Sequence, residues 1–163
     1  MFQIIFGIVF PVVFGLSGLY DLWLGYLALV GATQSARWPS IDGTIRSAEA
    51  AKRTMVGEPG VRPRIVYDYI VDGKPFTGER IAFGMQDNFY SGRGFAQKYI
   101  ERYPSGSRVR VSYDPARPAS SVLEPGFSFW ALLPTLFGTG TLIVVCLLFA
   151  AYGSGYLAQI ETR

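Results

Sequence analysis

The chain has 163 residues, half of them hydrophobic, and a formal net charge of +3. It contains no His and a single Cys, which excludes Ser-His and Cys-His nucleophilic catalysis, His-ligated zinc, c-type haem attachment and disulfide frameworks. Fourteen of the 15 Lys and Arg residues lie between two apolar ends, interspersed with Asp and Glu, which indicates a solvated surface and argues against a nucleic-acid partner.

The first apolar stretch, residues 2–20, predicts a helix that crosses a membrane. About 19 residues with a rise of 1.5 Å each span the hydrocarbon core of a bilayer, roughly 30 Å thick. No basic residue precedes the stretch, and it is longer than the apolar core of a secretory signal. We therefore expect a retained anchor.

Asp21 follows this stretch and is the only charged side chain near it. Tyr20, Trp23 and Tyr26 surround it in the sequence, and amphipathic aromatic rings gather at the boundary between lipid and water. We expect Asp21 at that interface; the alternative is a carboxylate held inside the bilayer for a function. The helix is predicted to continue to about residue 32.

Small side chains form a face on each apolar helix. On the first helix they recur at intervals of three and four residues, namely Gly18, Asp21, Gly25 and Ala28. The second helix is predicted over residues 129–152, with a short tail at 153–163, and its small-residue face holds Ala131, Thr135, Gly138 and Thr139. Such faces allow helices to approach closely. Two interpretations stay open: the helices pair with each other, or one face docks on a different membrane protein.

Two spans place both termini on one side of the membrane and the domain between them on the other. Arg37, Arg46 and Arg117 near the domain ends outnumber Arg163 near the termini, which favours a cytoplasmic domain. The rule weakens for loops longer than about 60 residues, so the side is left open.

Residues 36–126 predict one small extramembrane domain rich in β-structure. Residues 41–47 read as a first strand, and residues 49–63 as a loop, because Gly57, Pro59, Gly60 and Pro63 interrupt regular structure. Alternation over residues 65–71 predicts a second strand. Asp72 and Gly73 then form a two-residue turn, which would place Tyr69 opposite Phe76 and Tyr67 opposite Gly78.

The second half of this domain predicts a helix and two more strands. Phe95, Tyr99 and Tyr103 recur every four residues, and Pro104 ends the helix. Residues 108–113 alternate, so the valines and Tyr113 point inward while the arginines face water, and residues 121–123 form a last short strand. The expected fold is therefore two transmembrane helices flanking a small antiparallel sheet, or barrel-like domain, with one short helix.

The segment before the short helix shows no clear periodicity but is rich in apolar residues, among them Phe83, Met85, Phe89 and Tyr90. An exposed apolar loop would mark a surface for a partner. The same residues could instead fold back onto the sheet or the membrane, and both interpretations stay open.

Three weaker candidates have ordinary structural explanations. The turn Gly92-Arg93-Gly94 could bind an anion but is expected to be a plain helix entry. Asp68 and Glu79 could form an acid/base pair but are expected to be solvated surface charges. An aromatic set could line a groove for a ligand but is expected to form the core; it comprises Tyr67, Tyr69, Phe76, Phe95, Tyr99, Tyr103 and Tyr113.

Three segments together resemble a known family. They are WPSIDGTI, YDYIVDGKPFTGERI and YPSGSRVRVSYDPARPASSVLEPG, within residues 38–126 and between two apolar helices. In their order and spacing they are similar to the bacterial family defined by the domain of unknown function catalogued as number 3592. The resemblance implies a small β-rich extramembrane domain on a two-span anchor. It implies no activity and no site residues.

We therefore expect a non-catalytic, two-pass protein of the bacterial inner (cytoplasmic) membrane that needs no cofactor and no metal. Its expected partners are membrane lipid and another membrane protein, for which it would be an accessory subunit, and it could form a homo-oligomer. The alternatives are an immunity-type protein that neutralises a membrane-acting toxin, and a module that binds lipid or a small molecule.

Overall fold

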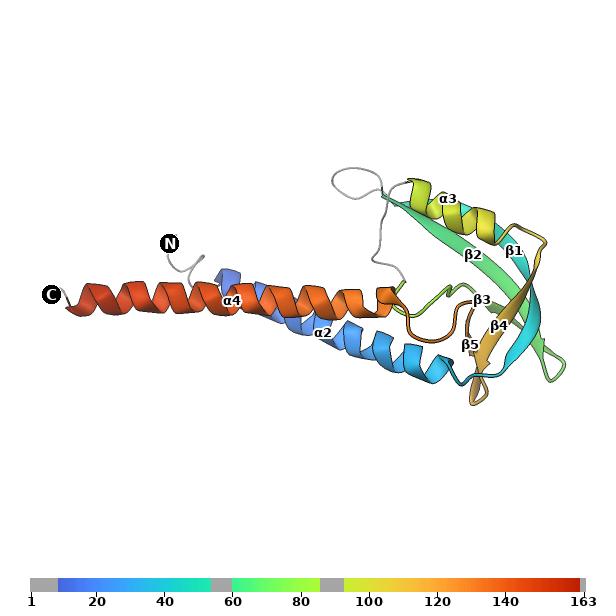
Figure 1. The fold of residues 1–163 in the computed structure, drawn as a ribbon, viewed down its shortest axis with the longest axis horizontal. Coiled ribbons are helices and arrows are strands. Elements are labelled where there is room, and N and C mark those ends of the chain that lie inside the picture. The colour runs from blue at the N-terminus through green and yellow to red at the C-terminus, as the bar shows by residue number, and fades with distance from the viewer. Residues whose placement is uncertain (1–8, 54–59, 86–92, 162–163) are drawn as a thin grey trace. The chain divides into compact units, whose positions relative to one another are not determined.

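The computed structural model describes residues 9–53, 60–85 and 93–161, and it confirms the expected fold class. Two long helices, α2 (Phe10–Ser35) and α4 (Phe129–Glu161), flank a five-stranded antiparallel sheet and one short helix (Figure 1). The chain divides into two compact units. One is the helix pair, up to Ala28 and from Ala131, and the other is the domain, Leu29–Trp130.

The strands are β1 (Ser40–Arg53), β2 (Gly60–Val71), β3 (Lys74–Gly78), β4 (Arg108–Asp114) and β5 (Arg117–Val122), in the spatial order β3-β2-β1-β4-β5. The segments that follow the two edge strands come together. The amide of Glu124 donates to the carbonyl oxygen of Ile81 at 2.8 Å, and the amide of Leu123 donates to the same oxygen at 3.1 Å. The sheet therefore curls into a nearly closed, barrel-like form.

The turn between β2 and β3 is the two-residue hairpin that the sequence predicts. Asp72 and Gly73 have φ angles of 50° and 76°, as a type I′ turn requires. Tyr69 pairs with Phe76 and Tyr67 with Gly78, so the predicted register is confirmed.

The predicted loop at residues 49–63 is wrong at both ends, because β1 runs to Arg53 and β2 begins at Gly60. Ala50 pairs with Pro63 in this extension. Among the described residues β3 pairs with β2 only from Tyr67 onward, so Pro63 lies where β2 has one partner strand and a missing amide donor is tolerated. The strands form a ribbon longer than the rest of the sheet.

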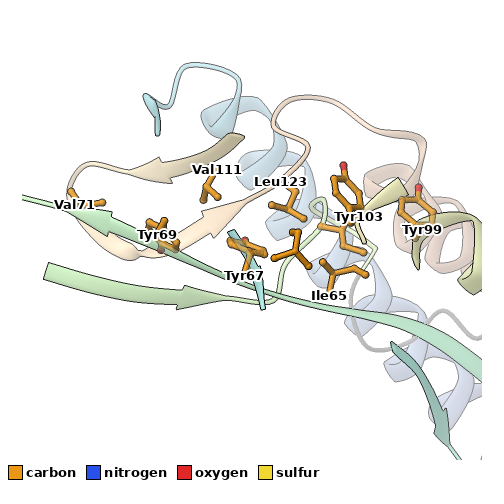
Figure 2. Packing of buried hydrophobic residues seen from close by; sticks show 10 residues of the cluster. Ile65, Tyr67, Tyr69, Val71, Tyr99, Tyr103, Val111 and Leu123 are labelled. Atoms are coloured by element: carbon orange, nitrogen blue, oxygen red, sulfur yellow. The ribbon is translucent and has the colours of Figure 1, made fainter. Parts of the chain in front are cut away.

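The aromatic set forms the core, as expected. Tyr67, Tyr69, Tyr99 and Tyr103 are buried together with Ile45, Ile65 and Val111, while Phe76, Phe95 and Tyr113 pack against this cluster. Figure 2 shows Ile65, Tyr67 and Leu123 gathered in one space. Tyr67 crosses the interior: its hydroxyl donates to the carbonyl oxygen of Arg80 at 3.0 Å and lies 3.1 Å from Ser121 Oγ.

The short helix α3 (Arg93–Arg102) is present where predicted and packs on β2 and β1. Val111 is buried and Val109 and Tyr113 are partly buried, while Arg108 and Arg110 are exposed, as the alternation predicts. The last strand starts at Arg117, earlier than the predicted residue 121.

Both long helices are apolar and long enough to cross a membrane, judged by length and composition. Helix α2 continues to Ser35, slightly beyond the predicted residue 32, and its last turns belong to the domain unit. Helix α4 continues through the segment expected to be a tail, as far as Glu161.

Gly78 is predicted to be required by the Tyr67 ring. A Cβ at this position would collide with that ring and lie 2.5 Å from Ser121 Oγ. We expect G78A to destabilise the full-length protein by about 1–3 kcal/mol, the usual cost of overpacking, in thermal unfolding followed by circular dichroism in detergent. The control is G94A in α3, where a Cβ meets no atom within 4 Å. A G78A protein as stable as G94A would contradict the prediction.

Candidate functional site: the helix pair and the aromatic segment

The small-residue faces of α2 and α4 pack against each other within the helix pair. A Cβ added to Gly25 would overlap the Thr135 hydroxyl, and one added to Gly138 would lie 2.7 Å from the Gly18 carbonyl oxygen. Gly18 itself faces Leu142. Glycines therefore bring the two helix backbones close together.

The other small residues contribute in different ways. Ala28 and Ala131 are both buried, and Ala131 has no exposed surface. Thr139 Oγ1 donates to the carbonyl oxygen of Thr135 at 2.8 Å within α4. Thr135 Oγ1 is buried and has no hydrogen-bond partner among the described residues. Pairing of the two helices, one of the two interpretations of these faces, is thus what the structure contains.

Asp21 differs from its neighbours in the helix pair. Its side chain is only partly exposed, and within the described part of the chain it has neither a hydrogen bond nor an ion pair. Tyr20, Trp23 and Tyr26 all point outward, 58–60% exposed, and the rings of Trp23 and Tyr26 stack at 5.9 Å. The helix pair therefore presents one carboxylate beside a patch of bare aromatic rings.

Two open apolar grooves run along the helix pair. The larger, about 480 Å³, is lined by residues of both helices: Leu22, Thr139, Leu142, Ile143, Cys146, Leu147 and Ala150. The second, about 370 Å³, is lined nearer the N-terminus of α2 by Phe10, Phe14, Leu136, Phe137, Gly140, Thr141, Val144, Val145 and Leu148.

The aromatic segment, which is the stretch before α3 that contains Phe83, Met85, Phe89 and Tyr90, divides into two parts. The Phe83 ring lies on Gly31 of α2, meets Trp38 edge-on at a centroid distance of 5.8 Å and has the Arg80 guanidinium 4.7 Å above it. Met85 packs on the core. Both residues thus fold back onto the domain. Phe89 and Tyr90 lie outside the described residues.

The sequence analysis missed a connection between distant segments of the domain. The Gly126 amide donates to the buried Ser35 Oγ at 2.9 Å, and Ser128 Oγ donates to the Phe83 carbonyl oxygen at 3.1 Å. The first bond joins the end of α2 to the segment before α4, and the second joins Phe83 to that segment. Phe127 and Phe129, on either side of Ser128 in the sequence, are 63% and 62% exposed, and the sequence analysis did not single them out. The bonded residues are 91 and 45 positions apart, so no local pattern could reveal the pairs.

The charged candidates are ion-paired on the exposed face of the sheet. Asp68 lies 2.7 Å from the Arg46 guanidinium and accepts a hydrogen bond from Thr77, and Glu79 lies 3.0 Å from Arg64. Each carboxylate is occupied by its own arginine, as expected for surface charges. In the candidate anion-binding turn, Gly92 lies outside the described residues, and α3 begins at Arg93.

Burial raises the pKa of four tyrosines of the domain, Tyr67, Tyr69, Tyr99 and Tyr103, and the shift is largest for Tyr67 and Tyr103. Burial raises the pKa of Tyr67, and hydrogen bonding to Ser121 opposes the rise. Burial also raises the pKa of Tyr103, and so does Glu124, which accepts its hydrogen bond at 2.8 Å and pairs with Arg102 at 2.9 Å. The hydroxyls of Tyr67 and Tyr103 act as structural donors that stay protonated at neutral pH.

Metal ligation finds no support in the part of the chain that the structure describes, where no three His, Cys, Asp or Glu side chains group together.

Comparison with known families gives one match. The model described as Domain of unknown function (DUF3592) matches residues 41–128, more than half of the chain, in agreement with the resemblance over residues 38–126. The comparison with curated proteins found no match.

Gly25 is predicted to be required for the close packing of α2 against α4. We expect G25L to separate the helices, because the new side chain would displace Thr135. Spin labels at Ser17 and Thr141, in a chain whose Cys146 is replaced by Ala, should give a narrow distance distribution that broadens in G25L. The control is G15L in the same helix, where an added Cβ has no neighbour within 4 Å. Similar broadening in both variants would contradict the prediction.

Tyr67 predicts a loss of stability at alkaline pH. Below about pH 10, the ordinary pKa of Tyr, the hydroxyl is neutral in the folded and the unfolded chain and its contribution is complete. Above that pH the unfolded chain releases the proton while the folded chain keeps it, because the folded pKa is raised. The free energy of unfolding then falls by up to about 1.4 kcal/mol per pH unit. Thermal unfolding in detergent at increasing pH should show a smaller slope for Y67F, whereas equal slopes would show that Tyr67 is not the cause.

Proposed function

This chain belongs to the family of the Domain of unknown function (DUF3592), and we propose that it is a non-catalytic, membrane-anchored accessory subunit that binds another membrane protein. The observation that carries the proposal is the bare apolar surface of the helix pair. The small-residue faces already pack on each other, so the surface left for lipid and for a partner is the outer one.

The exposure of α2 and α4 supports a place in the bilayer. Only 11% of the most apolar part of each helix is buried, whereas the core helix of a water-soluble protein is mostly buried. Leu16, Leu19, Phe137 and Leu147 are each more than half exposed. Lipid is the environment in which such surfaces are stable. Because α4 lies far from the N-terminus, a signal sequence does not account for both helices.

We place the protein in the inner membrane of a bacterium as a two-pass protein, with the domain unit on one side and both termini on the other. The contacts that the last turns of α2 make within the domain unit support this placement. Gly31 and Ser35, in the last turns of the helix, contact Phe83 and Gly126 of the domain. The last turns of α2 therefore pack within the domain unit.

A binding role rather than a chemical one is supported by the composition and by the filled interior of the domain. The chain has no His, its lone Cys146 lies in α4, and Asp68 and Glu79 are held by arginines. Tyr67 and Tyr69 extend across the interior and hydrogen-bond to Ser121 and to the Pro118 carbonyl oxygen, so they occupy the space that a carried lipid would need.

The proposal predicts a stable complex. Full-length tagged protein extracted from its own membranes in gentle detergent should migrate on a native gel above its own mass of 18.0 kDa, with a second membrane protein in fixed ratio by mass spectrometry. A harsh ionic detergent, as the control, should reduce it to the single chain. A protein that runs alone after gentle extraction would refute the accessory-subunit role.

A further inference from the structure

We infer that Asp21 is the contact point for a partner membrane helix that carries a Lys or Arg side chain at the same depth. The inference rests on the proposed function, because it requires α2 to lie in the bilayer. It adds the chemistry of the partner and the residue that recognises it.

Asp21 lies well inside the helix pair. It precedes Ala28, the last α2 residue of that unit, by seven positions, or about 10 Å along the axis. The levels of α4 that pack on Gly25 and Gly18, at Thr135 and Leu142, lie on either side of it. The small-residue face therefore continues past Asp21 in both directions.

Apolar surface also continues on both sides of Asp21. Trp23 and Leu27 on its domain side are 58% and 46% exposed, and Leu16 and Leu19 on the other side are 63% and 57% exposed. If the bilayer boundary lay at Tyr20, the exposed Leu27 would be left in water, which bare apolar surface disfavours. Lipid that covers all of these side chains also surrounds Asp21.

A carboxylate at that depth needs a partner, and the described residues of this chain do not provide one. An ionised side chain in hydrocarbon costs a few kcal/mol on insertion scales unless it is paired. The hydroxyl one turn before it, Ser17, donates to the Phe14 carbonyl oxygen, and Thr139 donates to that of Thr135. Within the described helix pair no donor reaches Asp21.

Charge complementarity identifies the occupant. A cation at the same depth neutralises Asp21 and donates hydrogen bonds to it, so each charge removes the insertion cost of the other. A second copy of this chain offers no such cation, because residues 2–36 and 127–160 contain no Lys or Arg. The partner is therefore a different membrane protein with a basic residue in one of its spans.

A synthetic helix tests this directly. The full-length protein, labelled with a donor dye at K74C in a C146A chain, is placed in phosphatidylcholine vesicles with an acceptor-labelled poly-leucine helix bearing one central Lys. Energy transfer should show the Lys helix associating about tenfold more tightly than the same helix with Leu in place of Lys. D21N and D21L should abolish the difference. D42N, which removes an exposed carboxylate of the domain, should leave it unchanged.

Three outcomes would overturn the inference. They are equal association of the Lys and Leu helices, a preference for Lys that survives in both D21N and D21L, and energy transfer between two labelled copies of the chain that depends on Asp21. Thermal unfolding verifies that D21N, nearly isosteric with the original, remains folded. The native gel distinguishes failure of this inference from failure of the proposed function. A complex that persists in D21N refutes the role of Asp21 alone. The absence of any complex in the original chain refutes the proposed function.

Discussion

The hydroxyl of Tyr67 is the group on which the domain depends. A buried hydroxyl without a hydrogen bond is costly, and this one is satisfied only where the end of the β3 hairpin and strand β5 meet, at Arg80 and Ser121. The ring in turn requires a glycine opposite it, at position 78. Beyond this point Ile81 pairs with Leu123 and Glu124, and Gly126 bonds to Ser35. A line of contacts thus leads from one phenol to the end of α2.

The charged face of the sheet has a smaller role. Its ion pairs, such as Arg46 with Asp68 and Arg110 with Asp42, join neighbouring strands but are solvent-exposed, and exposed pairs contribute about 0–1 kcal/mol each. Their value lies in solubility and in satisfying charges. This separates the domain into a filled apolar side that determines the fold and a polar side on which Asp42, Asp68 and Glu79 are paired with arginines. The distinctive chemistry of the chain is left to the helix pair.

Local patterns predicted most of the fold. The Asp72-Gly73 turn determined the hairpin register through φ angles alone, and the four-residue spacing of aromatics located α3. The strand ends were misjudged because Pro63 disfavours a central strand but is tolerated beside an open edge, and whether an edge is open depends on where β3 ends. For the candidate site, spacing identified Gly18, Gly25 and Gly138. Their pairing across the two helices, and the bond between Ser35 and Gly126, involve residues far apart in the sequence, so spacing could not predict them. The same holds for Asp21, whose lack of a hydrogen-bond or ion-pair partner among the described residues depends on the packing of both helices.

Pro63 also protects the protein. The ribbon formed by the far ends of β1 and β2 leaves strand edges that a neighbouring molecule could extend by adding a strand of its own, the first step of edge-to-edge aggregation. A proline has no amide hydrogen for an incoming strand to bind, so Pro63 weakens such a pairing at this part of β2. The residue that obscured the strand in the sequence is thus a reason why that strand can be long without pairing with a neighbouring molecule.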